Sequence, residues 1–179
     1  ITHRVAHLVK NVGIHPDRIA AVTFTNRAAR EMRMRMTNLL GVGEKFLTAS
    51  TFHSLCARIL RIDGERIGVY SDYVIMDDSD QIELVKRAMQ DTQIDPKRYP
   101  PRNVLAAISR SKAKLVDAER LKEVSESYYE EIVAQIYNRY QSLVNSSHGL
   151  DFDDLLVKTI DLFRTIPEVL TKYQNRFRY

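Results

Sequence analysis

The sequence predicts an α/β fold with a short parallel sheet followed by a mainly helical region. A short apolar run, a Thr-Phe tip and a basic amphipathic helix follow one another twice within the first 60 residues. Strands joined by a helix in one sheet are normally parallel, with a right-handed crossover. From the helix that begins near Ile82 as far as Gly149, the sequence then has helical periodicity and no convincing strand.

Composition limits the class of protein. The 179 residues suffice for one domain, or for one domain with an insertion, and the net charge of +4 permits a nucleic-acid partner without proving one. Residues 18–66 hold nine Lys or Arg against four acids, and residues 97–116 hold six and none. The single Cys56, with no signal peptide and no apolar run long enough for a bilayer, predicts a cytoplasmic protein.

The first helix is expected over Thr2–Val12, where apolar residues recur at helical spacing before Gly13. His3 and His7 lie on it at i, i+4 spacing, which is typical of a metal pair. No carboxylate or cysteine follows at ligand spacing, so a solvated helix face is the favoured interpretation.

The first strand is expected at Ile19–Val22, a short apolar run flanked by charge. Thr25 or Asn26 can cap the helix that follows, and Gly41 can end it. The tip between strand and helix is a good place for an anion, because helix-start N–H groups are free there. Phe24 is a large ring at this tip, and the local sequence leaves open whether it stacks on a nucleobase or packs in the core.

The second strand is expected at Phe46–Ala49, followed by the tip Thr51–Ser54 and another helix. If the strands are parallel, both tips lie at the carboxyl edge of the sheet, where open α/β sheets bind ligands. Two aromatic and hydroxyl-bearing tips with arginines behind them predict a track for a single strand, since stacking contributes about 1–3 kcal/mol per base. His53 could contact a phosphate or base, or simply cap the helix.

The run Tyr73–Asp78 ends in two aspartates, as does the magnesium-holding strand of a nucleotide-binding site. However, Ser79, Asp80 and Gln81 follow directly, which is the pattern of a capped helix start. No phosphate-binding loop accompanies the aspartates, so a helix cap is the favoured interpretation.

The helical region has one basic helix end. A helix through Val104 and Ile108 carries Arg110, Lys112 and Lys114 at its far end, which predicts either a phosphate contact or a solvated end. A long amphipathic helix covers Tyr129–Val144, and its tyrosines are expected in the core.

Three carboxylates, Asp151, Asp153 and Asp154, open the next helix and suggest a metal. Negative charge is favoured at any helix start, so capping is the preferred interpretation. A last helix begins at Pro167. The sequence has no G-x-x-x-x-G-K-[ST] loop and suggests no Ser/His/Asp or Cys/His set, so no catalytic residue is assigned.

Three segments resemble the motifs of UvrD/PcrA-type superfamily 1 DNA helicases. Ala21–Met32 is similar to the first DNA-contact motif of this family, Thr51–Leu60 to the second, and Leu150–Leu156 to a further signature. Their order and separations also fit, and the resemblance covers the whole chain.

The resemblance implies a partial RecA-like motor domain at residues 1–70 and 150–179, with a mainly helical subdomain inserted at residues 71–149. It implies ATP-driven 3′-to-5′ translocation on single-stranded DNA and unwinding of duplexes, with ATP and Mg²⁺ as cofactors of the parent protein. The implied nucleic-acid-binding residues are Thr23, Phe24, Thr25, Asn26, Arg27, Thr51, Phe52, His53, Arg110 and Lys112.

The chain begins without Met and reads as an excised piece of a larger protein. In the family, the phosphate loop lies just before the position of Ile1, and the Asp-Glu strand that holds magnesium lies just after Tyr179. We therefore expect no ATP hydrolysis and no bound cofactor for this chain alone. The expected partners are single-stranded DNA, duplex–single-strand junctions and the remaining helicase domains, with no membrane. The alternatives are a helicase subunit of a helicase–nuclease complex, or a non-catalytic module whose long helix docks a partner protein.

Overall fold

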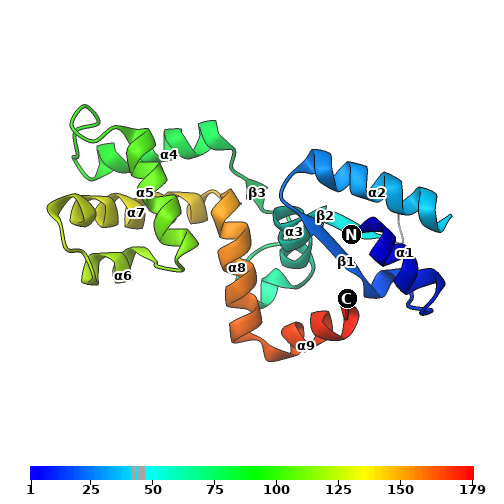
Figure 1. Ribbon diagram of the computed structural model, residues 1–179. Coiled ribbons are helices and arrows are strands. Elements are labelled where there is room, and N and C mark those ends of the chain that lie inside the picture. Colours follow the sequence, from blue (N-terminus) through cyan, green and yellow to red (C-terminus); the bar gives the residue numbers. More distant parts are fainter. Residues whose placement is uncertain (42, 44–46) are drawn as a thin grey trace. The chain divides into compact units, whose positions relative to one another are not determined.

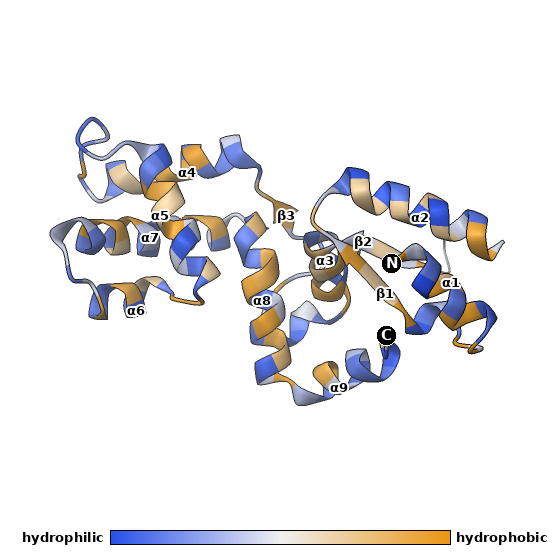
Figure 2. Ribbon diagram, viewed as in Figure 1, coloured by the Kyte–Doolittle hydropathy of each residue, from blue (hydrophilic) through white to orange (hydrophobic). Residues whose placement is uncertain are grey.

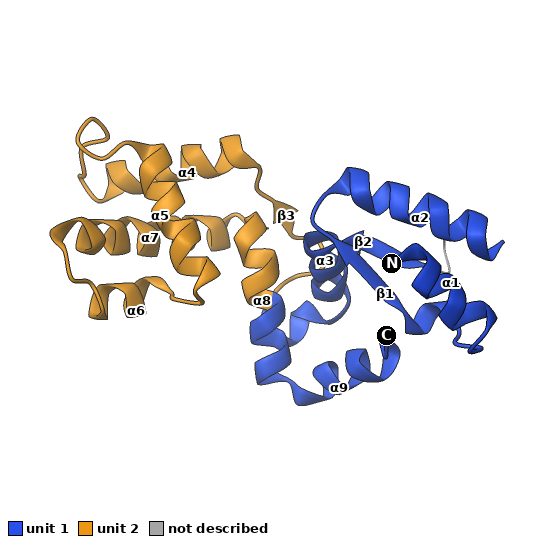
Figure 3. Cartoon of the chain, in the orientation of Figure 1, with its two compact units in different colours: residues 1–68, 159–179 blue, residues 69–158 orange. Residues whose placement is uncertain are grey.

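The computed structural model describes residues 1–41, 43 and 47–179, and they form two compact units. The first unit holds residues 1–68 and 159–179, and the second holds residues 69–158 (Figure 3). The insertion expected at residues 71–149 lies within the second unit, which also takes the first half of helix α8 (Phe152–Thr165).

The first unit is built on two parallel strands, β1 and β2 (Figure 1). Its elements are α1 (Thr2–Lys10), η1 (Pro16–Arg18), β1 (Ala20–Thr23), α2 (Asn26–Leu40), β2 (Thr48–Thr51), α3 (Phe52–Asp63), η3 (Gly64–Ile67), the second half of α8 and α9 (Pro167–Arg176). The strand register runs from Ala20 opposite Thr48 to Thr23 opposite Thr51, so the predicted parallel pair is confirmed. Both strands end level with each other, which brings their tips together.

Strand boundaries differ slightly from those expected. The first strand begins one residue later than predicted. The second strand runs on to Thr51, which is both the last residue of the strand and the N-cap of α3. Phe46, where the second strand was expected to begin, lies outside the described residues.

The free edge of β1 is met by the end of the chain. The Ala20 amide donates to the Tyr179 carbonyl at 2.9 Å, and the Arg178 amide donates to the Arg18 carbonyl at 3.0 Å. Two extended residues therefore run beside β1 on the side away from β2. An edge of this kind is a template for further strand pairing.

The core of the first unit lies between the strands and helices α1 and α2. Figure 2 shows β1 in hydrophobic colours and α2 with alternating ones, as expected for an amphipathic helix against a buried strand. The buried members are Val5, Leu8, Ile19, Ala21, Met32, Met36, Leu47 and Ala49. Gly41 ends α2 in the left-handed conformation at φ +67°, which confirms it as the helix terminator.

The second unit is a helical cluster with one short parallel pair. Its elements are β3 (Val74–Ile75), α4 (Asp78–Asp91), α5 (Pro101–Ala113), α6 (Ala118–Glu123), α7 (Tyr128–Ser146), β4 (Gly149–Leu150) and the start of α8. Val74 lies opposite Gly149 and Ile75 opposite Leu150. The sequence did not predict β4, and a side chain at Gly149 would overlap the Met76 side chain.

Helices α4, α5 and α7 bury the core of the second unit, with Val85, Met89, Val104, Ile108, Ile136, Tyr140 and Val144 at its centre. Of the two tyrosines at helical spacing that were expected in the core, Tyr140 is buried, whereas Tyr129 is exposed and its expected burial is wrong. Tyr137 is buried as well, and Tyr128 is exposed. Within the described residues, no helix has the length and apolar character needed to cross a bilayer.

The aspartates after β3 form a helix cap, as the sequence favoured. The Asp77 carboxylate accepts from the Ser79 and Asp80 amides at 2.7 and 2.9 Å, and the Asp80 carboxylate accepts from the Asp77 amide at 3.0 Å. The Ser79 hydroxyl also donates to the Asp77 carboxylate, and this bond, followed by those from the Asp80 and Ser79 amides, lowers the pKa of Asp77. A reciprocal cap of this kind satisfies orphan N–H groups at the start of α4.

Candidate nucleic-acid interface

Two aromatic rings meet where β1 and β2 end. The ring centroids of Phe24 and Phe52 lie 5.4 Å apart, with the ring planes inclined at 47°. Phe24 is 86% exposed and Phe52 is 40% exposed. Phe24 therefore does not pack in the core, which was one of the two possibilities that the local sequence left open. Adjacent exposed rings at a sheet edge form a platform on which a flat ring can stack.

The hydroxyls of the two tips shape the platform. The Thr25 hydroxyl accepts from the Ala28 amide at 3.2 Å and caps α2. The Thr51 hydroxyl accepts from the Ser54 amide at 3.1 Å and pairs with the Ser54 hydroxyl at 2.8 Å. Thr51 is buried, so the direct contact expected between its side chain and DNA does not fit this structure. The side chain instead fixes the strand-to-helix turn that presents Phe52.

Both capped helices point their N-termini toward the same edge, because both follow the ends of parallel strands. Helix N-termini carry partial positive charge and attract anions. Asn26 and Arg27 are exposed in the first turn of α2, and His53 is half-buried in the first turn of α3, directly after Phe52. The edge thus combines exposed rings, an amide and a cation, with the imidazole next to them.

The arginines of α2 have different environments. The Arg33 guanidinium donates from Nη2 to the Ala49 carbonyl at 2.6 Å, which ties the helix to β2. Arg35 pairs with Glu31 one turn earlier on the exposed face. Arg27 and Arg30 are exposed and face solvent near the start of the helix. Arg27 and Arg30 are also the two arginines of α2 that lie closest to the tip in the sequence.

Lys112 is buried, contrary to its expected role as a phosphate contact. It is 2% exposed, and its ammonium donates to Asp151 Oδ2 at 2.6 Å and to Asp154 Oδ1 at 2.7 Å. The Tyr140 hydroxyl also donates to Asp151 Oδ2, at 2.8 Å. A direct contact from Lys112 to a nucleic-acid phosphate is therefore wrong, whereas Arg110 is exposed at the end of α5 and can still make one.

The sequence carried a signal for this burial. Val104, Ile108 and Lys112 recur at a spacing of four, so Lys112 lies on the apolar stripe of α5 that faces the core. Its carboxylate partners lie 39 and 42 positions away along the chain, so the sequence around Lys112 could not identify them.

Asp151 and Asp154, at the start of α8, take part both in the ion pairs with Lys112 and in the cap of the helix. Asp151 accepts from the Asp154 amide at 2.8 Å, which is the capping role that the sequence favoured. Burial raises the pKa of Asp154, although the neighbouring Lys112 ammonium acts in the opposite direction. Among the described residues, no group of three or more His, Cys, Asp or Glu is arranged to hold a metal ion. His3 and His7 are therefore not part of such a group.

A second ion-pair cluster joins α3 to α9 in the first unit. Asp63 accepts from the Lys172 ammonium at 2.8 and 2.9 Å and from the Tyr173 hydroxyl at 2.8 Å. Desolvation opposes ionisation of Asp63, but the hydrogen bonds from Lys172 and Tyr173 outweigh it and lower the pKa of the carboxyl. Burial raises the pKa of the nearby Cys56 thiol, which is the opposite of what a nucleophilic cysteine needs.

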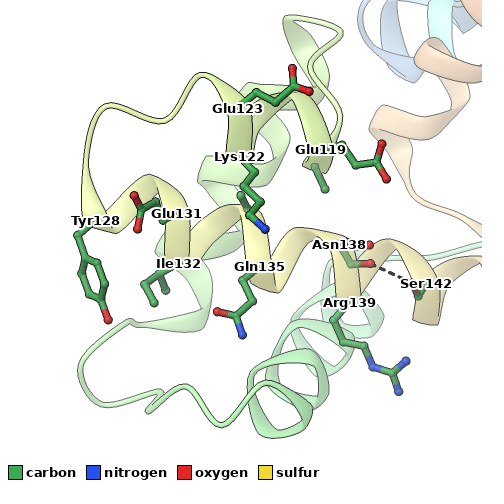
Figure 4. Close-up of a pocket in the computed structure, with 12 residues that line it drawn as sticks. Glu119, Lys122, Glu123, Tyr128, Glu131, Ile132, Gln135, Asn138, Arg139 and Ser142 are labelled. Carbon is green, nitrogen blue, oxygen red and sulfur yellow. Dashed lines mark hydrogen bonds between the residues drawn. The ribbon is translucent and has the colours of Figure 1, made fainter.

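The second unit has an open hollow of about 1040 Å³ beside α6 and α7. Figure 4 shows its charged lining, with Lys122 and Arg139 among Glu119, Glu123 and Glu131. Arg139 already pairs with Asp91 at 2.7 Å. Because acids outnumber cations here, the hollow does not suit a polyanion, and the tips of the first unit are the better nucleic-acid candidate.

The sequence of this chain is similar to DNA helicases over its full length. It is 42% identical over 179 residues to the ATP-dependent DNA helicase PcrA of Bacillus subtilis, and 43% identical over 180 residues to that of Leuconostoc citreum. A PcrA from Staphylococcus epidermidis is 41% identical over 179 residues. Each match covers all of this chain and about a quarter of the relative's length, 24% for the first two and 25% for the third.

A family model gives the same result. The model of the UvrD/REP helicase N-terminal domain matches residues 1–179, which is every residue of the sequence. The two aromatic tips and the capped aspartates at the start of α8 are the segments that carried the resemblance in the sequence. The chain belongs to the UvrD/REP helicase N-terminal domain family.

Proposed function

We propose that this chain supplies part of the single-stranded DNA track of an ATP-dependent 3′-to-5′ DNA helicase. The observation that carries the proposal is the pair of exposed rings, Phe24 and Phe52, 5.4 Å apart at the edge where both strands end. Relatives that match the whole chain are named ATP-dependent DNA helicases, which supports the same conclusion.

Phe24 stacks on a base in this proposal, because it is the most exposed large apolar side chain of the tips. Phe52 supports the Phe24 ring from the side. Asn26 and Arg27 hold the sugar–phosphate backbone where it passes the start of α2, and His53 contacts the strand beside Phe52. Thr23 and Thr25 contribute backbone groups, since the Thr25 hydroxyl is engaged in the cap.

ATP and Mg²⁺ belong to the parent protein in this proposal. The residues of this chain do not fit a complete triphosphate site, because the sequence has no G-x-x-x-x-G-K-[ST] loop. Asp77, at the end of the run that resembled a magnesium-holding strand, is engaged in the cap of α4. The chain's own contribution is therefore the grip on DNA at the tips. Arg110, which is exposed in the second unit, is a separate candidate for a phosphate contact.

Phe24→Ala tests the stacking role. A fluorescence titration with a labelled single-stranded oligonucleotide should show binding weakened about 5- to 150-fold, since stacking contributes about 1–3 kcal/mol per base. Tyr128→Ala is the matched control, because Tyr128 is an exposed aromatic residue at the start of α7 in the second unit and belongs to neither tip. Unchanged affinity in the Phe24 variant would remove the ring from the track and leave the proposal without its main support.

A further inference from the structure

A small hollow beside the tips has the chemistry of an anion site. It has a volume of about 270 Å³ and lies between residues of α2, β2 and α3 in the first unit. Its polar lining consists of Asn26, Arg30, Arg33, Ser50, Thr51 and Ser54. Two guanidinium groups, three hydroxyls and an amide thus surround the space, and the described part of the lining includes no carboxylate.

Two polar atoms of this lining are buried without a partner. Arg33 Nε and Ser50 Oγ make no hydrogen bond to any residue that the structure describes, although both are shielded from solvent. The other side of the Arg33 guanidinium is held by its 2.6 Å bond to the Ala49 carbonyl. A buried donor without an acceptor is unfavourable, above all on a charged group, and such a site calls for a missing partner.

The hydroxyls can supply a further donor. Thr51 Oγ1 accepts from the Ser54 amide, so its own hydrogen can go to Ser54 Oγ at 2.8 Å. The Ser54 hydroxyl hydrogen is then free to point into the hollow. A further cation lies near this lining, since the pKa of Arg58 is lowered first by burial and then by the neighbouring Arg176 and Arg33 guanidinium groups.

We propose that this hollow binds one phosphodiester group of the single strand, with Arg33 and Ser50 as the buried ligands and Arg30 closing the outer side. The proposal rests on the function proposed above and adds a site to it. Phosphate oxygens accept several N–H and O–H donors at once, and the guanidinium fork matches their geometry. The volume corresponds to about nine water molecules at about 30 Å³ each, which is ample for a phosphate group.

The site predicts one definite change in salt dependence. For single-stranded DNA, the slope of log affinity against log salt changes by about 0.7 for each phosphate neutralised. The double variant Arg30→Gln with Ser50→Ala, in the full 179-residue chain, should weaken oligonucleotide binding and reduce this slope by about 0.7. A series of oligonucleotides, each with one uncharged methylphosphonate at a different position, locates the contact. For the unchanged chain, affinity should fall when the methylphosphonate is at one particular position. For the double variant, the same substitution at that position should cause no loss.

Arg35→Gln is the matched control, because Arg35 lies on the same helix and is paired with Glu31 outside the hollow. It should leave the methylphosphonate profile unchanged. Thermal unfolding of Ser50→Ala should match that of the unchanged chain, since the hydroxyl has no partner to lose. Inorganic phosphate, compared with chloride at equal ionic strength, should compete with the oligonucleotide in the unchanged chain only.

The two proposals fail in different ways. If Phe24→Ala weakens binding while the double variant keeps the slope and the position-specific loss, the phosphate site is wrong and the stacking track stands. If inorganic phosphate stabilises the chain but the methylphosphonate scan is flat, the hollow holds a free anion and the DNA site is again wrong. If neither Phe24→Ala nor the double variant changes binding, both proposals fall.

Discussion

Two basic helix segments of this protein look alike in the sequence and have opposite fates in the fold. At the start of α2, Arg27 and Arg30 stay exposed beside the aromatic tips. Near the end of α5, Lys112 is enclosed by Asp151 and Asp154 and lies 5.4 Å from the centre of the Tyr140 ring. The comparison shows that a basic run is available for contact with DNA only where its helix face points to solvent.

The difference follows from what each helix packs against. Helix α2 covers a small sheet with one face and leaves its opposite face free, so its polar positions stay in water. Helix α5 is packed among α4 and α7, and the Lys112 position falls on its inward face. A cation there needs carboxylate partners, because an unpaired buried charge is strongly unfavourable.

Lys112→Ala should give the largest loss of stability, and it tests whether the buried cation supports the fold. It leaves Asp151 and Asp154 buried without their cation, which costs about 3–5 kcal/mol in the free energy of unfolding. Urea unfolding measures the loss. Lys114→Ala, on an exposed residue two positions later, should change stability by less than about 0.5 kcal/mol. Equal stability of the two variants would show that the buried cluster does not support the fold.

The helix caps at the two tips give the next effect. Thr51→Ala removes a buried hydroxyl with two hydrogen-bond partners, and should cost about 2 kcal/mol in unfolding free energy. Thr25→Ala removes one bond from an exposed hydroxyl, and should cost about 0.5–1 kcal/mol. Chemical denaturation compares the pair, with the two Thr→Ser variants as controls that keep each hydroxyl. A larger loss of unfolding free energy for Thr25→Ala than for Thr51→Ala would contradict this ranking of the two caps.

The partly exposed ion pair between Asp63 and Lys172 should give the smallest effect, and the lowered pKa of Asp63 sets the direction of its pH dependence. The folded carboxyl ionises more readily than its ordinary pKa of 3.8. Its contribution is therefore fully present above about pH 4 and is lost as the pH falls through the folded value. At pH 7, Asp63→Asn should cost at most about 1 kcal/mol, because its partner Lys172 is half exposed.

The pH series itself is the measurement for Asp63. The difference in unfolding free energy between Asp63→Asn and the unchanged chain should shrink as the pH falls below 4. Asp72→Asn, on an exposed carboxylate, should show no such trend. A difference that stayed constant down to pH 2 would mean that the ion pair does not cause the loss.

Much of the first unit followed from local patterns. Short apolar runs predicted the two strands, and the Thr-Phe tips predicted their ends, because strand length and capping chemistry are encoded within a few residues. Asp77 was also identified as a cap from the acids that follow it. The pairing of β3 with Gly149–Leu150 could not be predicted, since two-residue strands carry too little pattern and the partners lie 75 positions apart.

The sequence by itself determined the two strand-to-helix tips, their parallel arrangement and the residue types they display, because these depend on nearest neighbours and on the handedness of the chain. Only the tertiary structure decided which cations face water. Burial is a property of a helix face against its neighbours, so it placed Lys112 between two distant carboxylates and left Phe24 beside Phe52 at an open edge. It also brought Arg33 and Ser50 to one hollow, because α2 and β2 come together only when the sheet forms.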